Sequence, residues 1–182
     1  MKAKVNKVTI HLTRDAVFAT DAAALVNATD ASLSLSPELI EKAGVEVARE
    51  CALIGWCEVG TAAITGAGTL AAKKLIHAVG PRWGEGSERG KLASVTWDCL
   101  RLAEANRLRS VALPAISTGT LGYPVENCAT TMLGQIVNFS FEDLKHLRRV
   151  ILCLPDELTF EAFRREFERQ LADLRQSGAA TV

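Results

Sequence analysis

Short apolar runs of strand character alternate along this chain with segments whose apolar residues recur at helical spacing. Strands are predicted over residues 5–12, 22–27, 61–65, 74–79, 110–113 and 150–154. The segments between several of them read as helices; one example has Leu92, Val95, Thr96, Cys99 and Ala103 on a single face. Strands that alternate with helices form a largely parallel sheet with helices on both faces. We therefore expect an α/β fold, a three-layer α/β/α sandwich around a mixed, mostly parallel sheet.

Local signals mark where several of the helices begin and end. Ser36-Pro37-Glu38 combines an N-cap residue, a proline at the first helical position and an acid near the positive end of the helix dipole. We expect this helix to run towards Leu53, with a break or kink at Gly44 and an end at Gly55. Pro124 and Asp156 are expected to open two further helices.

The chain of 182 residues predicts one domain over residues 1–175, followed by a flexible tail over 176–182. Lys plus Arg and Asp plus Glu each number 21, so nucleic acid is not indicated as a partner. No apolar run approaches the roughly 20 residues that a membrane span requires, and no signal peptide is recognised. Five cysteines without a C-x-x-C pair indicate reduced thiols in a cytoplasmic protein. Three separated histidines predict no metal site, and no cofactor is expected.

The segment from Ala112 to Pro124 carries the main functional signal. An apolar strand enters a loop of small, hydroxyl-bearing and glycine residues, and a helix follows directly. In this order, backbone N–H groups and the positive end of the helix dipole converge on one point, where an anion such as phosphate can bind. Gly119 and Gly122 let the backbone turn and approach a ligand closely.

Two other patterns suggest chemistry that their context does not support. Residues 66–71, Gly-Ala-Gly-Thr-Leu-Ala, match the dinucleotide fingerprint G-x-G-x-x-A, but a strand follows where that fingerprint requires a helix. We expect a hairpin turn there. Ser117, Thr118 and Thr120 lie in no G-x-S-x-G elbow and have no triad partners in their sequence context, so we interpret them as hydrogen-bond donors. His77 lies within an apolar strand and is expected to be a core histidine.

Four segments in order resemble the macrodomain family of ADP-ribose-binding α/β modules. They are Arg14-Asp-Ala16, Ala24-Leu-Val-Asn-Ala-Thr-Asp30, the glycine-containing block of residues 60–81, and Leu113-Pro-Ala-Ile-Ser-Thr-Gly-Thr-Leu-Gly-Tyr-Pro124. The resemblance extends over about residues 5–171, and the third and fourth segments are the most specific.

The resemblance implies a ligand site. Asp15 matches the acid that accepts a hydrogen bond from the exocyclic amine of adenine, the Ala16 backbone matches its neighbour, and Phe160 matches the aromatic that stacks on adenine. Asp30 matches the second asparagine of an Asn-Ala-Ala-Asn-like element in which Asn27 looks more structural than catalytic. The loop that matches the diphosphate and distal-ribose site consists of Ser117, Thr118, Gly119, Thr120, Leu121, Gly122 and Tyr123.

Departures from the family pattern favour binding over hydrolysis. Hydrolytic relatives carry a run of glycines and an Asp before the first helix, whereas residues 30–37 here read Asp-Ala-Ser-Leu-Ser-Leu-Ser-Pro. Leu121 also replaces a common aromatic. We expect a binding module for ADP-ribose, a related adenine diphosphate nucleotide or an ADP-ribosylated macromolecule, and no catalytic residue is assigned. One alternative is an ADP-ribosyl hydrolase or O-acyl-ADP-ribose deacylase with Asp30 as the base. Another is a scaffold that has lost the ligand.

Overall fold

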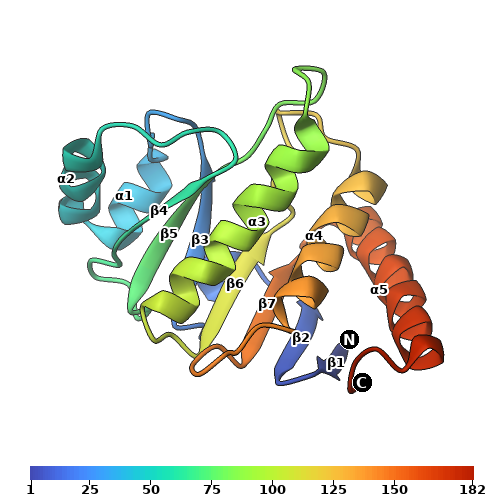
Figure 1. Ribbon diagram of the computed structural model, residues 1–182. Coiled ribbons are helices and arrows are strands. Elements are labelled where there is room, and N and C mark those ends of the chain that lie inside the picture. The colour runs from blue at the N-terminus through green and yellow to red at the C-terminus, as the bar shows by residue number, and fades with distance from the viewer.

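The computed structural model describes residues 1–182 and contains one mixed seven-stranded sheet between two helical layers (Figure 1). The three-layer α/β/α fold expected from the sequence is confirmed. In chain order the elements are β1 (Lys2–Val5), β2 (Val8–Thr13), the short 3-10 helix η1 (Val17–Ala19), β3 (Ala24–Thr29), α1 (Pro37–Ala43), α2 (Val45–Ile54), β4 (Ala62–Gly66), β5 (Lys74–Val79), α3 (Glu88–Ala105), β6 (Ser110–Pro114), α4 (Val125–Phe139), β7 (Arg149–Cys153) and α5 (Glu157–Ser177).

The strand order in the sheet is β1-β2-β7-β6-β3-β5-β4. The five central strands, β2, β7, β6, β3 and β5, run parallel, whereas β1 and β4 pair antiparallel with β2 and β5 at the two edges. The carboxyl ends of the parallel strands therefore lie at one end of the sheet. In sheets of this type, the loops that leave this end form ligand sites.

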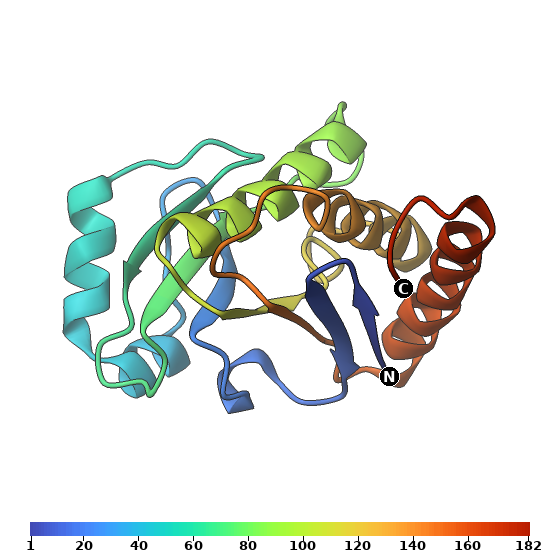
Figure 2. The same ribbon diagram turned by 60° about the horizontal axis from the view of Figure 1, so that its bottom comes forward.

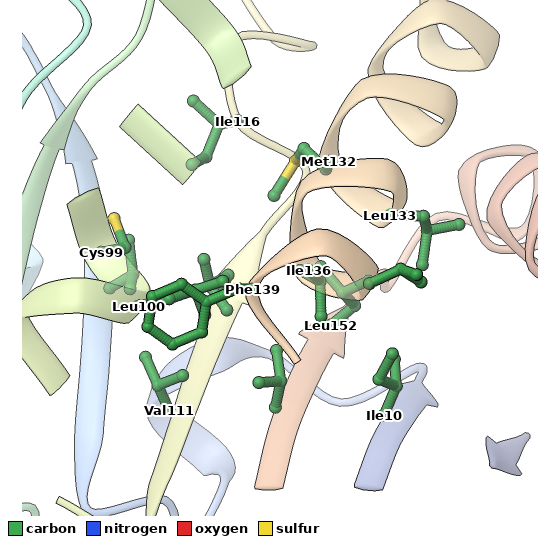
Figure 3. Packing of buried hydrophobic residues seen from close by; sticks show 14 of the residues in the cluster. Ile10, Cys99, Leu100, Val111, Ile116, Met132, Leu133, Ile136, Phe139 and Leu152 are labelled. Atoms are coloured by element: carbon green, nitrogen blue, oxygen red, sulfur yellow. The ribbon is translucent and has the colours of Figure 1, made fainter. Parts of the chain in front are cut away.

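Helices α3, α4 and α5 cover one face of the sheet over the larger part of the core (Figure 1). The cluster on this face contains 33 buried residues. Trp97 of α3 packs edge-to-face on Phe139 of α4, with ring centroids 4.8 Å apart. Figure 3 shows the helix side chains Cys99, Leu100, Met132, Leu133, Ile136 and Phe139 above the strand residues Ile10, Val111 and Leu152.

Helices α1 and α2, together with η1, cover the opposite face with a smaller cluster of 15 buried residues. Gly44, at φ 89°, separates α1 from α2, and Gly55 ends α2, as the sequence predicts. Gly68 packs so closely on α1 that an added Cβ would overlap the carbonyl oxygen of Ala43. The segment with the G-x-G-x-x-A pattern thus joins the antiparallel strands β4 and β5, as expected, and no helix follows it.

The two ends of the chain meet at the β1 edge, where the first strand differs from the expectation. One strand over residues 5–12 was expected, but Asn6, at φ 54°, and Lys7 form a turn that splits the segment into the hairpin β1–β2. The expected tail over 176–182 begins inside α5, and Thr181 forms two hydrogen bonds with Asn6, of 2.7 and 3.2 Å. Figure 2 shows the two termini close to each other beside β1. No helix has the length and apolar character of a membrane span.

Candidate functional site

Three neighbouring cavities lie across the carboxyl ends of β3, β6 and β7. The first has a volume of about 570 Å³, the second about 480 Å³ and the third about 200 Å³. The first two share Ala28, the first and third share Ala115, and the second and third share Pro114, Cys153 and Pro155. The three cavities therefore lie next to one another, from the loop after β6 to η1 and α1, and we refer to them together as the hollow.

The loop between β6 and α4 forms one wall of the first cavity. The Tyr123 N–H donates to the Ser117 carbonyl at 2.9 Å, and the Gly122 N–H donates to the Gly119 carbonyl at 3.0 Å. Gly122 adopts φ 74°, a left-handed conformation that glycine reaches without strain. These bonds fold the chain back so that α4 begins directly after the loop, at Val125.

Hydrogen-bond donors in this loop are left without protein acceptors. The backbone N–H groups of Ser117, Gly119, Thr120 and Leu121 donate to no protein atom, and all four residues line the first cavity. The Ser117 hydroxyl is buried and has no partner either. Buried polar groups are normally paired, and consecutive free N–H groups form a concavity suited to an anion. The loop can therefore hold a phosphate-like group.

Gly80, the residue directly after β5, leaves room for this arrangement. A Cβ at this position would overlap the Ser117 hydroxyl and lie 2.5 Å from Ile116 Cγ2. Two residues further, the exposed Arg82 lines the first cavity and lies 3.5 Å from Glu85 in a loose ion pair. Gly80 and Arg82 were not among the predicted site residues, although Gly80 lies within the block of residues 60–81 that carried the family resemblance.

The opposite wall of the first cavity is built around Asp30. Its carboxylate accepts hydrogen bonds from the Ser32 hydroxyl at 2.7 Å, the Ser32 N–H at 3.1 Å and the Ser34 N–H at 3.2 Å. These bonds, that from the Ser32 hydroxyl above all, hold the pKa of Asp30 below its usual range. The carboxylate therefore organises its own loop, and its lowered pKa makes it a weak base.

Helix α1 continues this wall into the second cavity. The Ser36 hydroxyl caps the helix by accepting from the Leu39 N–H at 3.1 Å, and Pro37 occupies the first helical position, as predicted. Glu38 and Lys42, one turn apart, pair at 2.9 Å and line the second cavity. Most of the remaining lining is apolar and comes from η1, β3, β6 and the segment after β7.

The three residues predicted to contact adenine differ in their position relative to the second cavity. Ala16 lines it, with its neighbours Val17 and Phe18. Asp15 is exposed and accepts a 3.0 Å hydrogen bond from the Thr13 hydroxyl, outside the lining of the three cavities. Phe160 is half-buried, packs against the main core and lines none of them.

The predicted loop residues are likewise divided among the cavities. Asp30, Ser117, Gly119, Thr120 and Leu121 line the first cavity, and Thr118 lines the third. Gly122 shapes the turn, and the buried Tyr123 ring points away, edge-to-face against Trp83 with a centroid separation of 5.1 Å. The sequence analysis did not assign Val17, Phe18, Glu38, Lys42 and Cys153 to the site, because the sheet brings them together from distant segments.

Two relatives are similar to this chain over most of its length. An uncharacterized protein of Sulfurisphaera tokodaii is 40% identical over 161 residues, covering 84% of this chain and 87% of that protein. The O-acetyl-ADP-ribose deacetylase of Salmonella typhimurium is 38% identical, covering 83% and 85%.

Solved macrodomain structures have a fold similar to that of this chain. The Oceanobacillus iheyensis macrodomain with ADP has a TM-score of 0.89 at 24% identity, covering 95% of this chain and 97% of that one. The Trypanosoma brucei macrodomain in complex with ADP-ribose has a TM-score of 0.78 at 28% identity, covering 86% and 68%. The Macro domain family profile matches residues 26–132. This chain belongs to the Macro domain family.

Proposed function

We propose that this protein binds ADP-ribose in the hollow formed by the three cavities. The observation that carries the proposal is the row of free N–H groups at Ser117, Gly119, Thr120 and Leu121, beside the unpaired Ser117 hydroxyl. They converge at the start of α4, where the helix dipole also favours negative charge. A diphosphate supplies the acceptors that these donors lack.

The second cavity suits the adenosine part of the same ligand. Its apolar lining can accommodate a flat heterocycle, and it joins the first cavity at Ala28. Asp15 follows β2 beside this cavity, at the position where the family reads the adenine amine. Phe160 would stack on the base only after it moves from its place against the core. The distal ribose, free or attached to an ADP-ribosylated macromolecule, would lie between Asp30 and the loop after β6.

Binding is better supported than hydrolysis by the chain's own groups. The Asp30 carboxylate is engaged by three donors of its own loop, and its lowered pKa makes it a poor proton acceptor. Residues 30–36, before α1, contain neither the glycine run nor the further Asp that the resemblance implies for hydrolytic relatives. The 38% identity to proteins named O-acetyl-ADP-ribose deacetylase makes deacylation the second candidate.

Isothermal titration calorimetry with ADP-ribose and with ADP tests the proposal. We expect saturable binding of both ligands, weakened by Ser117→Ala and by Asp15→Ala. Asp173→Ala is the matched control for the second variant, because Asp173 lies on the exposed side of α5, paired with Arg169. No detectable heat with either ligand would show that this chain is a scaffold without a nucleotide site.

A second assay separates the binder from the deacylase. The protein is incubated with O-acetyl-ADP-ribose, and the ligand is analysed by liquid chromatography over several hours. We expect the acetyl ester to remain at the level of a protein-free control. Turnover that depends on protein concentration and is lost in Asp30→Ala would assign the deacylase activity to this chain instead.

A further inference from the structure

A row of polar side chains crosses three neighbouring strands beneath the second cavity. Asn27 on β3 lies opposite His77 on β5, which in turn lies opposite Ala63 on β4, two residues before Thr65. Asn27 Nδ2 is 3.2 Å from His77 Nδ1, and His77 Nε2 is 2.9 Å from Thr65 Oγ1. His77 is fully buried. Such a row must have each donor matched to an acceptor.

The hydrogen bonds around His77 match a ring that carries its proton on Nε2. The Thr65 hydroxyl can donate to the Gly66 carbonyl at 2.9 Å and accept from His77 Nε2, and Cys51 Sγ lies 3.7 Å from the same ring nitrogen. Burial lowers the pKa of His77 to about 4, and the ring is therefore neutral near pH 7. The single ring proton is then on Nε2, and Nδ1 is an acceptor. Only the Asn27 amide N–H₂ can supply the donor that Nδ1 requires.

This chain of bonds also determines which way the Asn27 amide faces. Because the nitrogen is held towards His77 on the β5 side, the oxygen is turned away from His77, and Asn27 lines the second cavity. Asn27 Oδ1 has no protein partner and is not sealed from solvent. The two charged side chains that line this cavity, Glu38 and Lys42, pair with each other.

We propose that Asn27 is a specificity-determining residue that accepts a hydrogen bond from the nucleoside part of the ligand, and that His77 and Thr65 are the positioning residues that fix its amide. The ligand group is an uncharged donor, either an amino group on the base or a ribose hydroxyl. A nucleoside without this donor would leave Oδ1 unpaired against apolar neighbours, which costs affinity. The identity of the ligand rests on the proposed function; the orientation of the amide does not.

The orientation is tested first, without ligand. Long-range ¹H–¹⁵N correlation spectra of the intact protein at pH 7 report which imidazole nitrogen carries the proton. We expect His77 to be neutral and protonated on Nε2. A proton on Nδ1 would reverse the required direction of the Asn27 amide and overturn the proposal, whatever the protein binds.

The recognition step is tested by titration with four ligands: ADP, 2′-deoxy-ADP, 3′-deoxy-ADP, and the diphosphate of purine riboside, which lacks the 6-amino group. Because the proposed function also assigns the 6-amino group to Asp15, the affinity of each analogue relative to ADP is compared between the wild type and Asn27→Ala. We expect the preference of the wild type for ADP over one analogue to fall by about tenfold in Asn27→Ala, the typical value of one neutral hydrogen bond. The analogue affected identifies the donor. If Asn27→Ala has the same preferences as the wild type for all three analogues, Asn27 does not read the ligand.

Two variants of His77 test whether its ring orients the Asn27 amide or only fills space in the core. Gln at position 77 can accept from Asn27 through its carbonyl, whereas Phe cannot. We expect His77→Gln to retain the discrimination between ADP and the affected analogue and His77→Phe to lose it, irrespective of their melting temperatures. Equal discrimination in the two variants would overturn the positioning role. If wild-type protein binds no ADP at all, the proposed function fails, while the spectra still decide the orientation of Asn27.

Discussion

Gly80 and Ser117 share a small volume at the base of the first cavity. A methyl group at position 80 would overlap the Ser117 hydroxyl and press on Ile116 Cγ2, both in the segment that leads into the loop after β6. We expect Gly80→Ala to lower the free energy of unfolding by about 1–3 kcal/mol, as overpacked buried sites do, and to weaken ADP-ribose binding because the free N–H groups shift. Urea denaturation and calorimetry measure the two effects.

Gly134 provides the matched control for this substitution. It lies in the middle of α4, its φ is not in the left-handed region, and an added Cβ would meet nothing within 4 Å. Gly134→Ala should raise the free energy of unfolding by about 0.5–1 kcal/mol, from helix propensity alone, with no change in affinity. An equal loss of stability in both variants would contradict the close approach at Gly80.

His77 makes stability depend on pH in a defined window. Its pKa is lowered by burial to about 4 from the ordinary value of 6.5, so the unfolded chain binds a proton that the folded protein does not. The neutral His77 contributes fully to the free energy of unfolding above pH 6.5. This contribution is lost as pH falls towards 4, and about 2 kcal/mol of it is lost at pH 5. The fall in the free energy of unfolding from pH 8 to pH 5 should be smaller by this amount in His77→Gln. Equal pH dependence in both proteins would show that His77 is protonated in the folded state.

At the scale of elements, Glu104 connects the end of α3 to the segment before β7. Its carboxylate accepts from three consecutive N–H groups, those of Lys145, His146 and Leu147, at 2.6–3.1 Å. Although burial acts to raise the pKa of Glu104, these bonds bring it below the usual value. We expect Glu104→Ala to lower the free energy of unfolding by about 2 kcal/mol, measured by urea denaturation. Glu142→Ala, at an exposed position in the same connection, should have no measurable effect.

Helix α1 depends on its cap more than the longer helices do. It has seven residues, and the Ser36 hydroxyl accepts from the Leu39 N–H in its first turn. We expect Ser36→Ala to cost about 1 kcal/mol and to accelerate hydrogen exchange at Ile40 and Ala43, while Ser36→Asp retains the protection. Faster exchange in α4 as well would mean that the whole domain had loosened rather than this helix alone.

The elements that were predicted correctly from the sequence are those whose ends are determined by residues next to them in the chain. A cap, a proline and a glycine at φ 89° define the ends of α1 at Ser36, Pro37 and Gly44 whatever lies elsewhere in the chain. The hairpin β1–β2 was missed because its turn, Asn6-Lys7, interrupts an alternating pattern that continues through it.

The candidate site also has parts that could be predicted from the sequence and parts that could not. The loop after β6 was predictable because strand, loop and helix follow one another directly. The pairs Gly80–Ser117 and Asn27–His77 are separated by 37 and 50 residues and meet only through the parallel order of β3, β5 and β6. The position of Asp30 was predictable, whereas its hydrogen bonds within its own loop were not.

At the scale of the whole molecule, the two helical layers are unequal. Helices α3, α4 and α5 pack on a cluster of 33 buried residues, but α1, α2 and η1 pack on one of 15. The second cavity lies under this smaller layer, and the first lies between the loop after β3 and the loop after β6. A ligand that fills the hollow therefore joins the less extensively packed part of the protein to the more extensively packed part.

This arrangement predicts how ADP-ribose stabilises the protein. At a free concentration 100 times its dissociation constant, a ligand that binds only the folded state adds about 2.7 kcal/mol, which for a domain of this size raises the melting temperature by about 5–10 °C. Because the contacts lie on both walls, hydrogen exchange should slow in η1, residues 30–36 and residues 117–122, with little change in α5. Thermal unfolding and exchange measured with and without ADP-ribose test both statements. A thermal shift with protection confined to α5 would place the ligand outside the hollow.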